Sequence, residues 1–153
     1  MSAQFAPPPS TLDKLDAALK RLADRHGFTR LANEAALDAA LDGSGLAALL
    51  LTDDPQRSPE SLDVAVVLPE ALRALGVTAS GLAAGADLSP ALARRFGVNR
   101  YPAAVVLRDG DYLGAISGIL DWSPFVTELA RISALAPSRP PISISTQATR
   151  SCA

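Results

Sequence analysis

Apolar residues recur at helical spacing in the first quarter of the chain. They predict an amphipathic helix over residues 11–25, with four leucines on one face: Leu12, Leu15, Leu19 and Leu22. After Gly27, an N-cap asparagine at position 33 begins a second short helix or turn, which ends at Leu41 before the sequence DGSG. The first part of the chain is therefore predicted to be helical.

The middle and the end of the chain carry strand patterns. Residues 46–52 are almost all apolar, which equally allows a helix, but their position between turn signals favours a strand buried on both faces. Residues 80–87 form a weaker strand candidate because they contain two glycines. The apolar run 105–107, the pair Asp109-Gly110 and the renewed apolar character from Tyr112 onward predict a β-hairpin.

Three further helices are predicted from proline-containing N-terminal signals. Ser58-Pro59 offers a capping serine for a helix that is bent or restarted near Pro69. Ser89-Pro90 offers a capping hydroxyl for a helix that stops at Gly97, and a final helix begins around residues 121–124. Pro102 stands at the start of the first hairpin strand, where a cis peptide bond is expected.

The order of these elements predicts an α/β protein with a mixed central sheet of about four strands between helical layers. The helix before Gly97, the sequence FGVNRYP, the hairpin and the last helix resemble the C-terminal half of the thioredoxin fold, with Pro102 matching its cis-proline. We expect a flexible N-terminal lead at residues 1–10, a thioredoxin-like domain at 11–136 and a disordered C-terminal tail at 137–153.

Composition excludes several classes of function. The net charge is -2 and the pI is about 5.3, so no basic field exists to hold nucleic acid or an anionic membrane. The longest apolar run, residues 46–51, is far shorter than the roughly 20 residues that span a bilayer. The N-terminus has no basic region and does not resemble a secretory signal, so a cytoplasmic location is expected, without membrane insertion.

The sequence offers little for catalysis. Its single cysteine, Cys152, can neither close an intramolecular disulfide nor make a zinc site. At the position of a thioredoxin Cys-x-x-Cys pair stand Ser58 and Ser61, whose hydroxyls cannot exchange two electrons, and Ser58 is interpreted as a helix cap. Asp53 and Asp54 are too few for a metal site. We expect no catalytic residue, metal or cofactor.

A more specific resemblance emerges when LLLTDDPQRSPESLDVAVVLPE is combined with RFGVNRYPAAVVLRDGDYLGAISGILDW. Together they resemble the hydrogenase expression and formation proteins of the HyaE/HupG type, a cysteine-less branch of the thioredoxin-like superfamily. The resemblance spans roughly residues 12–135. It implies a non-catalytic chaperone that takes part in the maturation of an exported nickel-iron uptake hydrogenase. This chaperone would bind the small-subunit precursor or its twin-arginine signal peptide.

The resemblance also implies where the partner binds. Thioredoxin-like proteins bind an extended segment along the cis-proline loop, so the candidate partner-binding residues are Asp53, Asp54, Arg57, Tyr101 and Pro102. The two aspartates would meet the arginines of the signal peptide.

Two alternatives remain open at this point. One is a monothiol redox protein that acts through Cys152, and the other is a scaffold that docks other hydrogenase maturation proteins through an exposed sheet edge.

Overall fold

The computed structural model describes residues 5–43, 45–137 and 140 of the 153-residue chain. Within these residues helices and strands alternate through most of the chain. In chain order they are α1 (Thr11–His26), β1 (Thr29–Arg30), α2 (Glu34–Leu41), β2 (Leu46–Leu51), α3 (Glu60–Ala74), β3 (Ser80–Ala84), α4 (Ser89–Phe96), β4 (Ala103–Arg108), β5 (Asp111–Ser117) and α5 (Trp122–Ser133).

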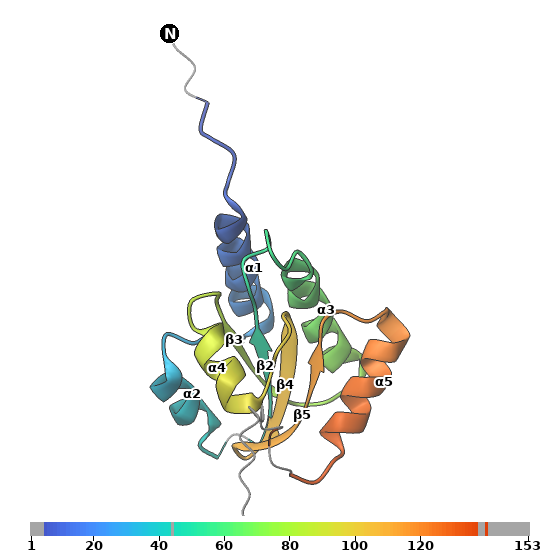
Figure 1. The fold of residues 1–153 in the computed structure, drawn as a ribbon. Helices are drawn as coiled ribbons and strands as arrows, with labels where there is room; N and C mark the ends of the chain where they lie inside the picture. Colours follow the sequence, from blue (N-terminus) through green and yellow to red (C-terminus); the bar gives the residue numbers. More distant parts are fainter. Residues whose placement is uncertain (1–4, 44, 138–139, 141–153) are drawn as a thin grey trace, which may run out of the picture.

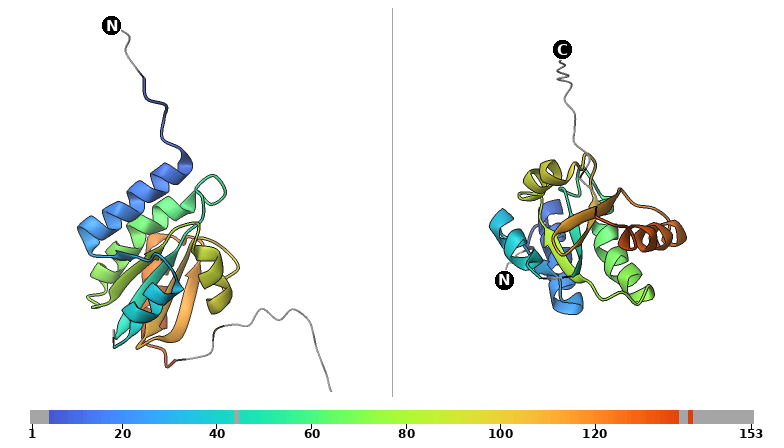
Figure 2. Two further views of the ribbon diagram at one scale, coloured as in Figure 1. Left: turned by 90° about the vertical axis from the view of Figure 1, so that its left-hand side faces the viewer. Right: turned by 90° about the horizontal axis from the view of Figure 1, so that it is seen from below.

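The strands form one mixed sheet in the order β1-β3-β2-β4-β5. β3 runs parallel to both β1 and β2, whereas β4 is antiparallel to β2 and to β5. Figures 1 and 2 show α2 and α4 on one face of the sheet and α3 and α5 on the other. The helix α1 belongs to the second face, because its leucines share a core with α3 and α5. The α/β prediction with helical layers on both faces is confirmed.

The central strand β2 explains why both faces are covered. All six of its residues are buried. Ala48 and Leu50 pack with α1, α3 and α5, while Leu49 and Leu51 pack with α2 and α4. Successive side chains of a strand point to opposite faces, so this continuous apolar run requires helices on each side.

Local signals set the ends of several elements, and two of them, the Asn33 cap and the Asp109-Gly110 turn, confirm predictions. Ser10 caps α1 in a capping box with Asp13, and Gly27 ends the helix in a left-handed conformation. Asn33 caps α2 through the backbone N–H of Ala36 at 2.8 Å. Asp109 and Gly110, both with positive φ, close the hairpin between β4 and β5.

The structure corrects four details of the prediction. The sheet has five strands, not about four, because β1 is a two-residue exposed strand with no apolar pattern that could reveal it. The helix α3 is continuous through Pro69, so of the two predicted forms, bent or restarted, the restart is wrong. Its N-cap is Pro59, so the capping role predicted for Ser58 is wrong as well. The Ser89 hydroxyl does not cap α4 either; it bonds to the ends of two strands.

Some predictions lie wholly or partly outside the described residues. Residues 1–4 of the expected lead and most of the expected tail, including Cys152, are among them. Among the residues that the structure describes, no helix combines the length and the apolar character needed to cross a membrane.

Candidate functional site

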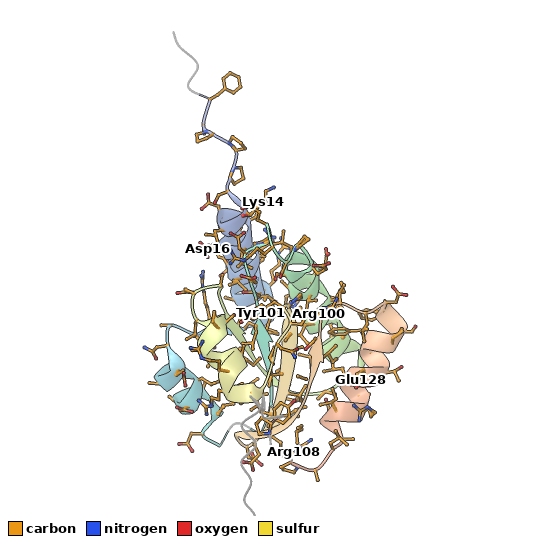
Figure 3. The ribbon with its side chains drawn as sticks, in the orientation of Figure 1. Lys14, Asp16, Arg100, Tyr101, Arg108 and Glu128 are labelled. Carbon is orange, nitrogen blue, oxygen red and sulfur yellow. The ribbon has the colours of Figure 1, made fainter. Side chains whose placement is uncertain are left out.

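The predicted partner-binding residues gather at one end of the sheet. β2 and β4 pair antiparallel with Leu51 opposite Ala103, so the loop that follows β2 meets the loop that precedes β4. The first loop carries Asp53, Asp54 and Arg57. The second carries Tyr101 and Pro102, and Figure 3 shows Tyr101 at this end with Arg108 at the opposite end. We call the five predicted side chains the Tyr101 surface.

Asp53 and Arg57 form a two-pronged ion pair within the loop. Nη2 of Arg57 donates to Oδ1 of Asp53 at 2.7 Å, and its Nε donates to Oδ2 at 3.2 Å. The hydrogen bond from Arg57 is the main reason why the pKa of Asp53 is below its usual value. The Asp53 side chain is 17% exposed and that of Arg57 69%, so the guanidinium covers the carboxylate from the solvent side.

Asp54 is held in a different way. Its Oδ1 accepts a short hydrogen bond from the Thr11 hydroxyl and another from the backbone N–H of Gln56 at 2.9 Å. The bond from Thr11 is the first cause of the lowered pKa of Asp54. Its Oδ2 receives no hydrogen bond from any residue that the structure describes, so one oxygen of this carboxylate is available to a partner.

Charges of opposite sign act on Tyr101. Burial is the main cause of its raised pKa; the negative charge of Asp53 raises it further, and the positive charge of Arg94 lowers it. The peptide bond between Tyr101 and Pro102 is cis, as predicted. The carbonyl of Pro102 accepts the backbone N–H of Gly118 at 2.7 Å, which attaches the loop after β5 to the same surface.

A cavity of about 470 Å³ opens beside Asp54, between the first turns of α1 and the loop after β3. Apolar side chains of α1 line one part of it. The charged lining consists of three carboxylates and two guanidinium groups: Asp16, Asp54, Asp87, Arg30 and Arg57. The excess of one negative charge makes this side of the Tyr101 surface suited to a cationic side chain.

The two serines at Cys-x-x-Cys spacing have different roles in the structure. Ser61 is fully buried, and its hydroxyl accepts the backbone N–H of Asp53 at 3.2 Å. The carbonyl of Ser58 accepts the N–H of Ser61 at 3.0 Å. The pair therefore supports the shape of the loop. Among the described residues no group of three or more His, Cys, Asp or Glu side chains is placed to hold a metal ion.

The sequence identified the loops but not all of their contacts. Thr11 lies 43 positions from Asp54, and no local pattern connects them. The sequence pattern places Asp87 only at the end of a weak strand candidate, although this residue lines the cavity. The spacing of four between Asp53 and Arg57 is a signal that could have been used, since it suits an ion pair within one turn.

The fold and this site define a thioredoxin-like protein whose loop after the central strand holds an Asp–Arg pair and two serines in place of cysteines. The chain superimposes on a point-mutant thioredoxin from Halobacterium salinarum with a TM-score of 0.57 at 18% identity, covering 71% of this chain and 93% of that one. A putative oxidoreductase with a thioredoxin fold gives 0.56 at 14% identity, over 72% and 97% of the two chains. These likenesses show the fold.

Sequence comparison narrows the class to one family. A profile described as hydrogenase-1 expression protein HyaE matches residues 18–125. Hydrogenase expression/formation protein HoxO of Cupriavidus necator is 39% identical over 145 residues, which cover 92% of this chain and 88% of that protein. Hydrogenase expression/formation protein HupG of Bradyrhizobium diazoefficiens is 38% identical over 112 residues, 71% and 75% of the two chains. The chain belongs to the HyaE family, and it is an accessory protein of hydrogenase expression and formation.

Proposed function

We propose that this protein is a chaperone that binds the small-subunit precursor of an exported nickel-iron hydrogenase, or the twin-arginine signal peptide of that precursor, without catalysing a reaction. Family membership supports the hydrogenase-related role. The observation that carries the proposal is the convergence of three loops at one end of the sheet, with charged and aromatic side chains exposed or half-buried on them.

The charges on the α1 side of the Tyr101 surface favour a cationic segment. An arginine from a partner would meet the free Oδ2 of Asp54 and the cavity beside it, which has three carboxylates against two guanidinium groups. At Asp53 the same arginine would compete with Arg57, which already occupies both carboxylate oxygens. Asp54 is therefore the stronger of the two candidate contacts.

The chemistry of the loop supports binding rather than catalysis. The side chains at Cys-x-x-Cys spacing are serines, and Ser61 is buried as part of the loop scaffold. Tyr101 has a raised pKa and keeps its proton at neutral pH, so it can donate a hydrogen bond to a bound segment. An extended segment would lie across Tyr101 and Pro102 by strand addition.

The test is a calorimetric titration of the purified full chain with the small-subunit precursor. Reversing both aspartates (Asp53→Lys with Asp54→Lys) should weaken binding by about tenfold or more, because charged contacts contribute about this much or more. The matched control is Asp42→Lys with Asp111→Lys, two exposed carboxylates for which the structure shows no ion pair among the described residues. Circular dichroism checks that each variant is folded. Equal affinity of the two double variants would contradict the role of Asp53 and Asp54, and failure of the unmodified chain to bind the precursor would contradict the proposal itself.

Two further measurements separate the alternatives. If the signal peptide is the bound element, the mature small subunit without its leader should not bind; strong binding of the mature form would instead favour the docking scaffold, for which β5 offers an edge strand. Deleting residues 137–153 removes Cys152 and should leave the affinity for the precursor unchanged, whereas a monothiol protein would lose its activity.

A further inference from the structure

A second group of side chains lies where the loop after β5 begins. In the sheet β2 and β5 flank β4, so this loop and the loop that carries Asp53 lie on opposite sides of the Tyr101–Pro102 loop. Arg100 rests against Gly118 there: a Cβ atom built on Gly118 would be 3.2 Å from Cζ of Arg100 and 3.3 Å from its Nε. Gly118 also has a φ of +76°, which disfavours other residues. The guanidinium of Arg100 therefore occupies space that a side chain at position 118 would fill, and this holds its charge beside the Tyr101–Pro102 loop (Figure 3).

Arg94 brings a second positive charge from α4. Arg94 is exposed in the last turn of α4, seven residues before Tyr101 along the chain, and its positive charge lowers the pKa of the Tyr101 hydroxyl. Neither the Arg94 nor the Arg100 side chain makes a hydrogen bond or an ion pair with any residue that the structure describes. The contrast with Arg95 is direct, because that neighbour of Arg94 pairs with Asp38 at 2.7 Å. The guanidinium groups of Arg94 and Arg100 thus have all their donors available to a partner.

Apolar side chains continue this surface into the start of α5. Ile119 and Leu120 follow Gly118 directly and are 38% and 39% exposed, and Trp122 is 49% exposed. Exposed apolar groups that gather in one place mark sites of interaction, and tryptophan and arginine dominate the energetics of protein interfaces. We call Arg94, Arg100, Ile119, Leu120 and Trp122 the Arg100 patch.

We propose that the Arg100 patch binds an apolar segment of the hydrogenase small-subunit precursor that carries a carboxylate side chain. This inference rests on the proposed function and adds the chemistry of the bound segment. Charge complementarity carries it: the two guanidinium groups outweigh the one exposed carboxylate of this segment, Asp121, so the net positive charge attracts a carboxylate and repels an arginine. A basic stretch of the same partner is thereby directed to the other side of Tyr101, where the Asp54 cavity has the excess negative charge.

The first experiment measures the affinity of the full chain for the precursor by calorimetry. Arg94→Glu combined with Arg100→Glu should raise Kd about tenfold or more. The matched control is Arg21→Glu with Arg25→Glu, because these two arginines of α1 are also exposed and have no ion pair among the described residues. The control should change Kd less than about threefold, since its charges lie away from the bound segment.

The second experiment uses two synthetic peptides that differ at one position. Both are short and apolar; one has a central glutamate and the other a central lysine. Trp122 is the single tryptophan of the chain, so its fluorescence reports on the patch directly. The glutamate peptide should bind about tenfold more tightly than the lysine peptide, and this preference should shrink as salt is raised and vanish in the Arg94→Glu, Arg100→Glu variant.

The outcomes separate this inference from the proposed function. If the precursor binds the unmodified chain but Arg94→Glu with Arg100→Glu binds it equally well, the Arg100 patch is not the contact, while the proposed function stands. Equal loss in the Arg21, Arg25 control, or equal binding of the two peptides, would also overturn the inference. Failure of the unmodified chain to bind the precursor would overturn the proposed function instead.

Discussion

The buried hydroxyl of Ser89 gives the sharpest test of how the site is supported. Ser89 Oγ accepts the backbone N–H of Thr52 at 2.9 Å and donates to the carbonyl of Ala84 at 3.2 Å. The Thr52 hydroxyl donates to the same carbonyl at 2.7 Å. Ser89 and Thr52 are both fully buried. This small network joins the end of β2, where the site loop begins, to the end of β3 and the start of α4.

The loss of stability expected for Ser89→Ala follows from the hydrogen bonds that each buried group loses. The Thr52 N–H is left buried without its partner, which costs about 1–3 kcal/mol, while the Ala84 carbonyl keeps its bond from the Thr52 hydroxyl. In Thr52→Val, by contrast, the Ala84 carbonyl keeps its bond from Ser89 and the Thr52 N–H keeps its acceptor. Ser89→Ala should therefore destabilise the protein more than Thr52→Val.

Urea denaturation followed by circular dichroism measures both effects. We expect Ser89→Ala to lower the free energy of unfolding by about 2 kcal/mol, and the melting temperature by roughly 4–10 °C. The control Ser80→Ala changes an exposed serine at the start of β3 and should stay within about 0.5 kcal/mol of the unmodified chain. A loss below about 0.5 kcal/mol for Ser89→Ala, or a larger loss for Thr52→Val, would refute the reasoning.

Two other predictions concern packing and charge. Gly114→Ala should destabilise the protein by about 1–3 kcal/mol in the same assay, because its Cβ would lie 2.9 Å from Cγ2 of Ile132; a neutral effect would show that α5 can shift. The pKa of Asp53 is lowered in the folded state, so its pair with Arg57 stabilises the fold fully above the unfolded pKa near 4, and this contribution is lost as the pH falls through the lower folded value. The stability difference between the unmodified chain and Asp53→Asn should accordingly shrink from about pH 6 to about pH 2.5, and a constant difference would contradict the ion pair.

The parts of the fold that depend on neighbouring residues could be predicted from the sequence. Gly27 and Asn33 act within one helical turn, and the Asp109-Gly110 pair sets its own turn, so each is visible in a short window. Strand β1 could not be found in this way, because Thr29 and Arg30 become a strand only by pairing with β3.

The same distinction applies to the site. The antiparallel register of β2 and β4 brings the two predicted loops together, and the thioredoxin-like order of elements anticipated this. The Ser89 hydroxyl bonds to Thr52, 37 positions away, whereas the Ser-Pro pattern predicts a helix cap from neighbouring residues alone, so the sequence does not show that this hydroxyl serves the sheet. The lack of side-chain partners at Arg94 and Arg100 among the described residues likewise depends on where the carboxylates lie in the fold, which the sequence does not show.

The ion pair between Asp53 and Arg57 has a consequence for selectivity. Arg57 is only four residues from Asp53 in the same chain, so its effective concentration at that carboxylate is high. It therefore competes strongly with any cation of another molecule for the Asp53 carboxylate. A lone lysine or a metal ion gains little by displacing it. Under the proposed function, only a partner that contacts several groups at once would compensate for the lost ion pair, so the protein would discriminate between a matched segment and the isolated positive charges of unrelated proteins.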